Sequence, residues 1–506
     1  MLSATDSTTL RSAFLAAVSM VLLATAAGCL DKYGYVANDT GNDAEESNAD
    51  GAAQDTSPMD TAADTTETED TAPPAPDTTT ADTTPADTRA DSGDTCTPTN
   101  NGREVCDDVD NDCDGEVDER TNCTFVKYIK PPPAYYDKLQ PMGVALDGNG
   151  SVYVAGTASG DPTQAFVGKY DTVSGKKAWF NIYNSPDPVG VSDAVADSNG
   201  VVIAGSTDGK LGGVSPPQNV VDGFVARVKN DGTLGSAALF GSQSSARFES
   251  VAHSAGTLYA IGSNDVAGSQ SNATVAAYDA ATLNQKWTYT HTPMQRGEFG
   301  ADVAVNSNGV WASMVEGVGQ GNAKVDLVQL GTRNGKKQGE TTATSKAFNE
   351  GMVSSLAAGN GPIVCGGTSE LIGRQRHGDV DSFVLSYLPT LKRAWTKQIG
   401  SPAFDNCYEI VAESQTFAFG SALDGFNGKQ PYKKGGSFAY VAQLSSSGQL
   451  KSTTLFGTPK AVTPRDFDLS KKTYCIAGQT KGDFEGLGTP PRGGRLAFVG
   501  CAKTKP

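Results

Sequence analysis

Short strands recur along the chain from about residue 125 to its end, each with alternating or wholly apolar positions between turn residues. The clearest unit joins a strand ending in a small residue and glycine, as in VYVAGT and VVIAGS, to a later strand with a Phe-Val centre, as in QAFVGKYD and DGFVARVK. Seven copies follow one another at a spacing of roughly 50–58 residues. The first strands are anchored by Gly156, Gly205, Gly262, Gly366, Gly420 and Gly478, with Ser313 in the fourth copy.

Two further strands flank each of these pairs. The preceding strand carries a hairpin tip such as Asp-Gly-Asn-Gly or Ser-Asn-Gly, as in GVALDGNGS and DVAVNSNGV, and the following strands include KKAWFNIY and KRAWTKQIGS. Four short strands per unit are typical of a β-propeller blade. The sequence therefore predicts an all-β protein in which residues 124–506 form a seven-bladed β-propeller. Six or eight blades are the alternatives, because the fourth copy is the least regular.

The two ends of the repeat region complement each other. The last copy reaches Lys505 without a fourth strand, whereas Thr124–Lys130 is a lone strand ahead of the first copy. We expect this strand to complete the last blade and so to close the ring. The repeats resemble the SBBP-type β-propeller repeats of secreted bacterial proteins over nearly all of residues 125–506, and this resemblance implies the same fold.

Residues 1–28 have the features of a signal peptide. Arg11 precedes an apolar run from Ala13 to Ala27 that is too short to span a bilayer comfortably as a helix. The run ends in LLATAAGC, which resembles the lipobox of bacterial lipoproteins, although Ala26 stands where leucine is usual. The resemblance implies that Cys29 is lipidated and anchors the mature protein to the outer membrane or cell surface. Secretion without a lipid is the alternative.

The net charge of −17 belongs to one part of the chain. Residues 30–124 hold 26 acidic and 4 basic residues, whereas residues 125–506 hold 30 acidic and 35 basic ones. Residues 29–95 are mostly Asp, Thr, Ala and Pro, so they cannot bury enough apolar surface to offset the entropy of folding. We predict a disordered, extended tether. This charge distribution excludes a basic nucleic-acid-binding protein.

Residues 96–123 combine four cysteines with a dense acidic loop. Aspartates alternate ahead of Gly115 in the order D-x-D-x-D-G, in which oxygen ligands wrap a hard cation and glycine permits the sharp turn. Position twelve of an EF-hand loop, where a bidentate glutamate is expected, is Thr121. The candidate metal ligands are Asp110, Asp112, Asp114, Asp118 and the backbone carbonyl of Glu116.

The segment EVCDDVDNDCDGEVDE also resembles the metal-binding motif of the MopE type, EVCDGVDNDCDGxVDE, found near the start of bacterial surface proteins. The resemblance implies calcium (Ca2+), although Asp108 stands where the motif has glycine. Because the bidentate ligand is missing, we expect weak binding, with a Kd of about 10⁻⁴–10⁻³ M. The alternative is a solvated acidic loop held by disulfides. Zinc does not fit, since no histidine is near and the cysteine spacing is too wide.

The chain has eight cysteines besides Cys29, and an exported protein is expected to pair them. Cys475 and Cys501 end neighbouring strands of the last unit, which suggests a cross-strand bond. Cys365 and Cys407 fall in adjacent units and could bridge them. Two bonds of open pairing are expected in the short module, which is too small to be held by core burial alone. Its cysteines are Cys96, Cys106, Cys113 and Cys123.

Candidate chemistry in the repeats is sparse. His253, His291 and His377 lie in different units, and the sequence has no H-E-x-x-H, G-x-S-x-G or P-loop motif. The four tryptophans recur near equivalent repeat positions, so we expect blade core rather than a sugar-binding platform. They are Trp179, Trp287, Trp311 and Trp395.

These features together predict a non-enzymatic cell-surface lipoprotein whose propeller is a binding or structural head. Its expected partners are the membrane, through the lipid anchor, and a surface protein or anionic glycan at the basic loops between second and third strands. A propeller enzyme, a lyase or hydrolase, and a purely structural envelope protein are the alternatives. An electropositive pocket in the central channel would favour an enzyme or a ligand-binding protein. A channel filled with small apolar side chains would favour a structural role.

Overall fold

The computed structural model describes residue 113 and residues 124–504, with gaps at 136–137, 218–219, 242–244, 266–270, 292–297, 317–323, 345–351, 370, 373–375, 424–425, 427–436, 458–460 and 483–494. These residues belong to one compact unit, Thr97–Pro506. The expected signal peptide, tether and nearly all of the 96–123 module lie outside the described residues. No helix in the described part of the chain is long and apolar enough to cross a membrane.

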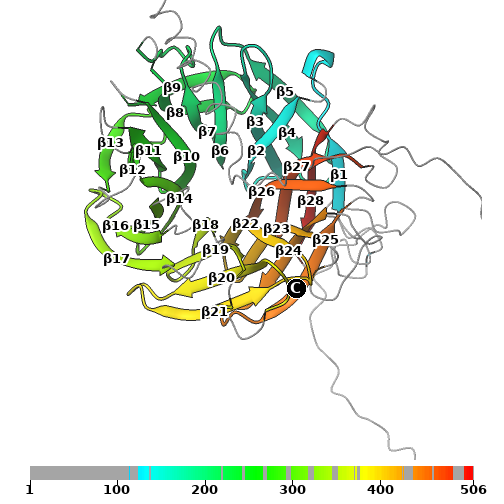
Figure 1. Ribbon diagram of the computed structural model, residues 1–506. Helices are drawn as coiled ribbons and strands as arrows, with labels where there is room; N and C mark the ends of the chain where they lie inside the picture. The colour runs from blue at the N-terminus through cyan, green and yellow to red at the C-terminus, as the bar shows by residue number, and fades with distance from the viewer. Residues whose placement is uncertain are drawn as a thin grey trace, which may run out of the picture. The chain divides into compact units, whose positions relative to one another are not determined.

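The described residues form seven four-stranded antiparallel sheets, arranged as the blades of a propeller around a central channel (Figure 1). This confirms the predicted seven-bladed, all-β fold. Blade 1 comprises β2 (Leu139–Leu146), β3 (Ser151–Ala158), β4 (Gln164–Asp171) and β5 (Lys177–Tyr183). Blade 2 comprises β6 (Val189–Asp197), β7 (Gly200–Thr207), β8 (Asp222–Lys229) and β9 (Leu234–Phe240). Blade 3 comprises β10 (Ala246–Ser254), β11 (Thr257–Asp265), β12 (Ser271–Asp279) and β13 (Gln285–Thr290).

The remaining blades follow the same order from the channel outward. Blade 4 comprises β14 (Glu298–Asn306), β15 (Gly309–Glu316), β16 (Lys324–Leu330) and β17 (Lys337–Thr344). Blade 5 comprises β18 (Met352–Ala358), β19 (Pro362–Thr368), β20 (Asp381–Tyr387) and β21 (Arg393–Ile399). Blade 6 comprises β22 (Asp405–Ala412), β23 (Thr416–Leu423), β24 (Ser437–Leu444) and β25 (Leu450–Phe456). Blade 7 comprises β26 (Val462–Ser470), β27 (Thr473–Thr480), β28 (Leu496–Lys503) and β1 (Thr124–Tyr128).

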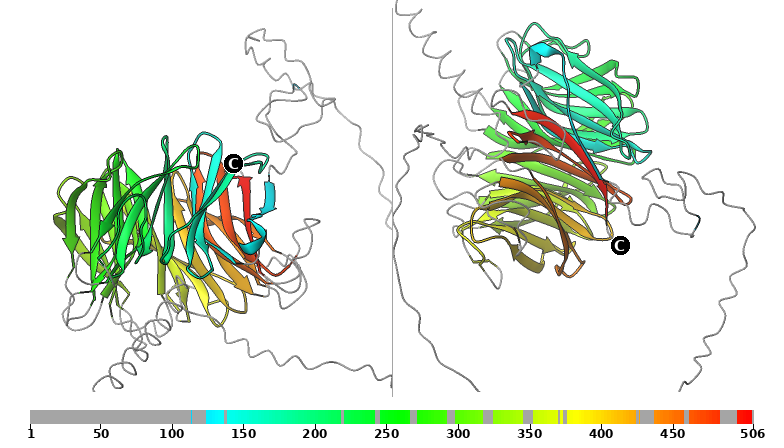
Figure 2. Two further views of the ribbon diagram at one scale, coloured as in Figure 1. Left: turned by 90° about the horizontal axis from the view of Figure 1, so that it is seen from above. Right: turned by 90° about the vertical axis from the view of Figure 1, so that its right-hand side faces the viewer.

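Blade 7 is built from both ends of the repeat region. β1 pairs antiparallel with β28, so that Thr124 faces Ala502, and the cyan β1 lies beside the red β28 in Figures 1 and 2. The amide of Ile129 then donates to the carbonyl of Ala497 at 2.9 Å, and the Ile129 side chain is buried. The predicted closure by Thr124–Lys130 is confirmed, with the strand itself ending at Tyr128.

A β-bulge near the start of every innermost strand explains the repeated glycines. Each bulge begins opposite the anchor of the second strand, as between Pro141 and Gly143 opposite Gly156. A Cβ on Gly156 would collide with the backbone carbonyl oxygen of Gln140. In blade 4 the anchor position is occupied by Met314, not by Ser313 as the repeat alignment predicted, and the bulged strand supplies the glycine instead.

Tryptophan side chains of three outer strands each contact the neighbouring blade, at the contacts of blades 1 and 2, 3 and 4, and 5 and 6. The Trp179 indole lies under Gly232 in the next blade, where φ is +85°, and its Nε1 donates to the Asn230 carbonyl at 2.9 Å. Trp287 and Trp395 repeat this contact at the next blade's turn. These three tryptophans are half-buried between blades, whereas Trp311 is fully buried in the core, as the sequence predicted.

Two disulfides tie the propeller, and both were expected from strand register. Cys475 and Cys501 face each other across β27 and β28 in blade 7. Cys365 in β19 bonds to Cys407 in β22, which links blade 5 to blade 6. All four cysteines are buried.

Candidate functional site: the central channel

The seven innermost strands line a central cavity of about 260 Å³. The described residues that line it include His253 and five carboxylates, but no lysine or arginine. From the sequence, an electropositive pocket is the expected sign of an enzyme or ligand-binding protein, and a channel of small apolar side chains is the expected sign of a structural role. The described channel lining matches neither, because it combines carboxylates with small apolar side chains. The carboxylates belong to Asp193, Asp302, Glu409, Asp466 and Asp468.

Four of these acids share one repeat position, the first residue after the bulge of the innermost strand. A bulge shifts the local register and so re-aims the side chain that follows it. The innermost strand has a neighbour on only one side, so amides on its channel edge lack a ladder partner. The seven residues at this position are Gly143, Asp193, Ser250, Asp302, Ser355, Glu409 and Asp466.

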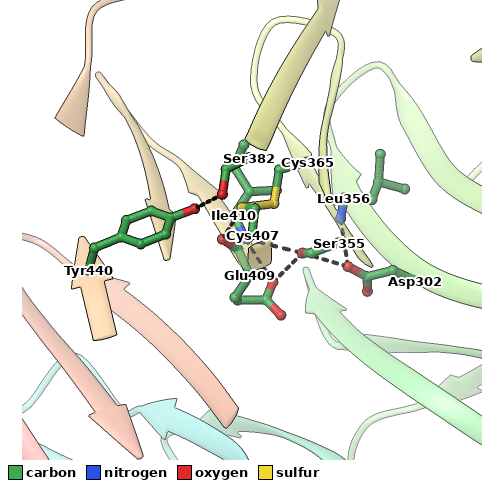
Figure 3. The surroundings of a disulfide bond; sticks show 9 residues. All are labelled: Asp302, Ser355, Leu356, Cys365, Ser382, Cys407, Glu409, Ile410 and Tyr440. Atoms are coloured by element: carbon green, nitrogen blue, oxygen red, sulfur yellow. Dashed lines mark hydrogen bonds between the residues drawn. A yellow bond between two sulfur atoms is a disulfide. The ribbon is translucent and has the colours of Figure 1, made fainter. Parts of the chain in front are cut away.

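Asp302 shows how such a carboxylate is used. Its Oδ1 accepts the amide of Val303 in its own strand at 2.7 Å, and its Oδ2 accepts the amide of Leu356 in blade 5 at 2.7 Å (Figure 3). The hydroxyls of Ser250 and Ser355 donate to the same carboxylate at 2.5 and 2.9 Å. One buried side chain therefore joins blades 3, 4 and 5.

The same contact recurs around the channel. Asp193 accepts the amide of Ala194 in its own strand at 2.7 Å and that of Val251 in blade 3 at 2.9 Å. Asp466 accepts the amide of Val144 at 2.5 Å, which connects blade 7 to blade 1. We call this set of carboxylate and hydroxyl contacts to edge amides the amide belt.

Blade 6 completes the described part of the amide belt. The amide of Ile410 contacts Ser355 Oγ at 3.2 Å and Glu409 Oε1 at 3.3 Å, and the Ser355 hydroxyl contacts the Glu409 carboxylate (Figure 3). The Cys365–Cys407 disulfide lies beside this contact in the same view. A covalent bond and a polar network therefore hold blades 5 and 6 together.

Asp468 lies one step further along the channel, in a ring that is otherwise lined by small apolar side chains such as Ala304 and Ala357. Burial raises the pKa of this carboxyl to about 7, against the opposing effect of the amides of Leu146 and Leu469, which donate to it at 2.7 Å. Asp468 thus adds a second contact between blades 7 and 1.

Three of the five channel carboxylates, those of Asp193, Asp302 and Asp468, each accept two backbone amides. In the described residues, no group of three His, Cys, Asp or Glu side chains could hold a metal ion. Burial also lowers the pKa of His253, which favours its neutral form at the channel wall.

A second polar cluster lies between blades 3 and 4, away from the channel. His291 Nδ1 lies 2.8 Å from Glu298 Oε2, and His291 Nε2 lies 3.4 Å from Glu340 Oε1. Lys337 Nζ pairs with Glu340 at 2.7 Å. The hydrogen bond to the buried Glu298 raises the pKa of His291. This cluster is another contact between blades and was not expected from the sequence.

Most sequence-predicted site residues lie outside the described part. These include Cys29, the five candidate calcium ligands, and Cys96, Cys106 and Cys123. Cys113 is described: it is disulfide-bonded, with a φ of +66°. Most of the basic loops that were expected to bind a partner also lie outside this part, including residues 427–436 and 483–494.

The amide belt was missed by the sequence analysis. Its signal is a polar residue at one fixed place in six of the seven first strands, as in SDAVAD, FESVAH, GADVAV and CYEIVA. Such a residue inside an otherwise apolar strand indicates a buried group with a dedicated partner.

No protein family matches the sequence, and no curated protein is significantly similar to it. Among solved structures, the chain is similar to the β-propeller domain of the Trilobed protease from Pyrococcus furiosus, with 9% identity, a TM-score of 0.42 and coverage of 74% of this chain and 97% of that one. It is also similar to quinohemoprotein alcohol dehydrogenase from Comamonas testosteroni, with 12% identity, a TM-score of 0.34 and coverage of 71% of this chain. The chain spans only 66% of that enzyme's length. Likeness at this level carries no argument about function.

Proposed function

We propose that the protein is a lipid-anchored protein of the outer membrane or cell surface whose propeller is a non-enzymatic binding or structural head. The lipobox-like LLATAAGC supports the anchor, and the acidic composition of residues 29–95 supports a tether that holds the head away from the membrane. The module at residues 96–123 would bind calcium weakly at the base of the head.

The amide belt is the observation that carries this proposal. Asp193, Asp302 and Asp466 each accept an amide from a neighbouring blade, so these carboxylates serve the contacts between blades. Their position supports a rigid ring whose outer loops are left to contact partners. A surface protein or an anionic glycan fits the lysine- and arginine-rich loops between second and third strands.

Two experiments test the proposal. Metabolic labelling with a fatty-acid analogue should mark the wild-type protein in the membrane fraction and leave Cys29→Ser unlabelled; equal labelling of both would refute the anchor. Binding of the mature protein to immobilised anionic glycans should fall when the basic residues of 484–495 are neutralised, and Asp302→Asn should leave the affinity of the folded protein unchanged. Loss of binding only in Asp302→Asn would place the ligand in the channel and contradict the proposal.

A further inference from the structure

A pair of buried carboxylates lies between blades 5 and 6. It is at one end of the strands, and the turns that the tryptophans contact are at the other end. Asp381 begins β20 and Asp405 begins β22, and both residues are fully buried. A Cβ on Gly400 would lie 2.6 Å from Asp381 Oδ1 and 2.8 Å from Asp405 Oδ2. Both oxygens therefore lie beside the Cα of Gly400, within about 5.4 Å of each other.

Three of the four carboxylate oxygens have hydrogen-bond partners. The amide of His377 and Nε2 of Gln398 donate to Asp381 Oδ2 at 2.7 and 2.9 Å. The amide of Ser401 donates to Asp405 Oδ2, and the Ser401 hydroxyl, with its single proton, lies 3.1 and 2.9 Å from the two oxygens of Asp405 and 2.8 Å from the Leu423 carbonyl oxygen. Asp381 Oδ1, which faces Asp405, has no hydrogen-bond partner.

Among the described residues, no positive side chain compensates the pair. In the described part of the chain, neither carboxylate forms an ion pair. The guanidinium of Arg376 instead donates to the carbonyl oxygens of Gly378 and Asp379. Two buried negative charges this close to each other are strongly unfavourable unless a proton or a cation lies with them. Among the described ionisable groups, Tyr440 of blade 6 interacts with Asp405, Tyr408 interacts with Tyr440, and Arg376, His377 and Asp379 precede β20 in the sequence.

We propose that Asp381 and Asp405 share one proton, and that this carboxyl pair is a pH-sensitive clamp between blades 5 and 6. The proton stays on an Asp405 oxygen and is donated to Asp381 Oδ1, which supplies the one missing hydrogen bond. When it leaves to solvent, two carboxylates face each other and the contact loosens. A metal ion fits less well, because calcium takes six to eight oxygen ligands and only one carboxylate oxygen here is free.

The repeat itself provides a comparison. Asp222 occupies the same position in blade 2 and also has a buried Oδ1 without a partner, next to Gly241. The place of Asp405 is taken there by Ala246, so no second carboxylate faces Asp222. Burial raises the pKa of Asp405 to about 8, with the charge of Asp381 acting in the same direction. The site in blade 5 thus differs from the site of Asp222 in having Asp405 where the other has Ala246.

The sign of the pH effect follows from the direction of this shift. A carboxyl whose pKa is higher in the folded than in the unfolded protein binds its proton more tightly when folded. Its contribution to stability is complete below the unfolded pKa of about 3.9 and is lost as the pH rises through the folded value. The clamp is therefore closed in mildly acidic and neutral solution and opens in alkaline solution.

Urea unfolding of the mature protein at about pH 6 and about pH 9 tests the clamp. The wild type should lose stability between the two values, whereas Asp405→Asn should lose clearly less, because its amide donates permanently to Asp381 Oδ1. Asp222→Asn is the matched control for a single buried acid, whose pKa burial also raises, and it should reduce the loss by less than Asp405→Asn does. An equal loss in the wild type and Asp405→Asn would overturn the proposal.

Infrared spectroscopy at neutral pH gives an independent readout on the wild type. The carbonyl band of protonated, buried carboxyl groups should be weaker in Asp405→Asn than in the wild type, and Asp468, whose pKa burial raises to about 7, contributes equally to both spectra. Identical bands in the wild type and Asp405→Asn would overturn the proposal. So would a rise in stability on adding calcium to Asp112→Ala protein that vanishes in Asp112→Ala/Asp405→Asn, since it would show that a metal ion occupies the pair.

Discussion

The carboxylate of Asp466 accepts a hydrogen bond from the amide of Val144, 322 residues earlier in the chain, at 2.5 Å. This contact joins the innermost strands of the last and first blades, while β1 and β28 join the chain ends on the outside of blade 7. The ring is therefore closed at both edges of the same sheet. Pairing with β1 also covers the edge of β28, as the fourth strand covers the third in the other six blades.

Removing β1 should destabilise the whole propeller. A protein that begins at Pro131 loses five paired residues and the buried Ile129, and β28 is left with an unpaired edge. We expect it to aggregate or to melt well below a protein that begins at Cys123, as measured by calorimetry and light scattering. Deletion of residues 30–95 is the control and should leave Tm nearly unchanged. Equal solubility and Tm for the Pro131 and Cys123 proteins would contradict closure by β1.

The two propeller disulfides should differ in what their loss releases. Each closes a loop of moderate length, with sequence separations of 42 and 26, so replacing either pair by serine should cost about 2–4 kcal/mol. Loss of Cys365–Cys407 removes the covalent link between two blades, whereas loss of Cys475–Cys501 acts within one sheet. Hydrogen exchange should therefore increase at the blade 5–6 contact only in Cys365→Ser/Cys407→Ser. Identical exchange patterns in the two variants would count against this distinction.

The contact between blades 3 and 4 should weaken as the pH rises. The pKa of His291 is raised in the folded protein, so its contribution is complete below the unfolded value of about 6.5 and is lost as the pH passes the folded value. His291→Gln should flatten this part of the stability profile in urea unfolding, while His377→Gln serves as a control. An unchanged profile in His291→Gln would show that the ion pair with Glu298 does not contribute.

Calcium binding is expected only at the acidic module. Titration calorimetry of the mature protein should show weak binding, with a Kd of about 10⁻⁴–10⁻³ M, because Thr121 replaces the bidentate ligand. Asp112→Ala should abolish the heat, and Asp265→Ala, an exposed aspartate on the propeller, should not. No heat at about 5 mM calcium, above the range of weak extracellular sites, would rule the site out.

The fold was predictable at positions where the structure tolerates only one kind of residue. Glycines recur as the anchors because a side chain there would collide with a bulged carbonyl, and the strand at Thr124–Lys130 was conspicuous because the last unit lacks a partner. Blade 4 shows the limit of this reasoning. In that blade the glycine, Gly300, lies in the first strand and Met314 faces it in the second strand. The repeat alignment therefore placed the anchor one residue early, at Ser313.

The amide belt and the carboxyl pair were not predictable from single positions. Asp302 is recognisable as a polar residue in an apolar strand, but its partners include the amide of Leu356, and an amide carries no sequence signature. The pairing of Asp381 with Asp405 depends on the space left by Gly400 between two blades. Such contacts are set by the arrangement of the blades rather than by the local repeat.

Amide hydrogen exchange on the channel edge tests the central claim most directly, because it measures the groups that the carboxylates are said to hold. The account predicts that the amides of Val144, Val303 and Leu356 are protected in the wild type although none lies in a strand ladder on that side. In Asp302→Asn, protection should fall at Val303 and Leu356 and persist at Val144. Rapid exchange of all three amides in the folded wild type would contradict the amide belt and return the channel carboxylates to the list of candidate catalytic groups.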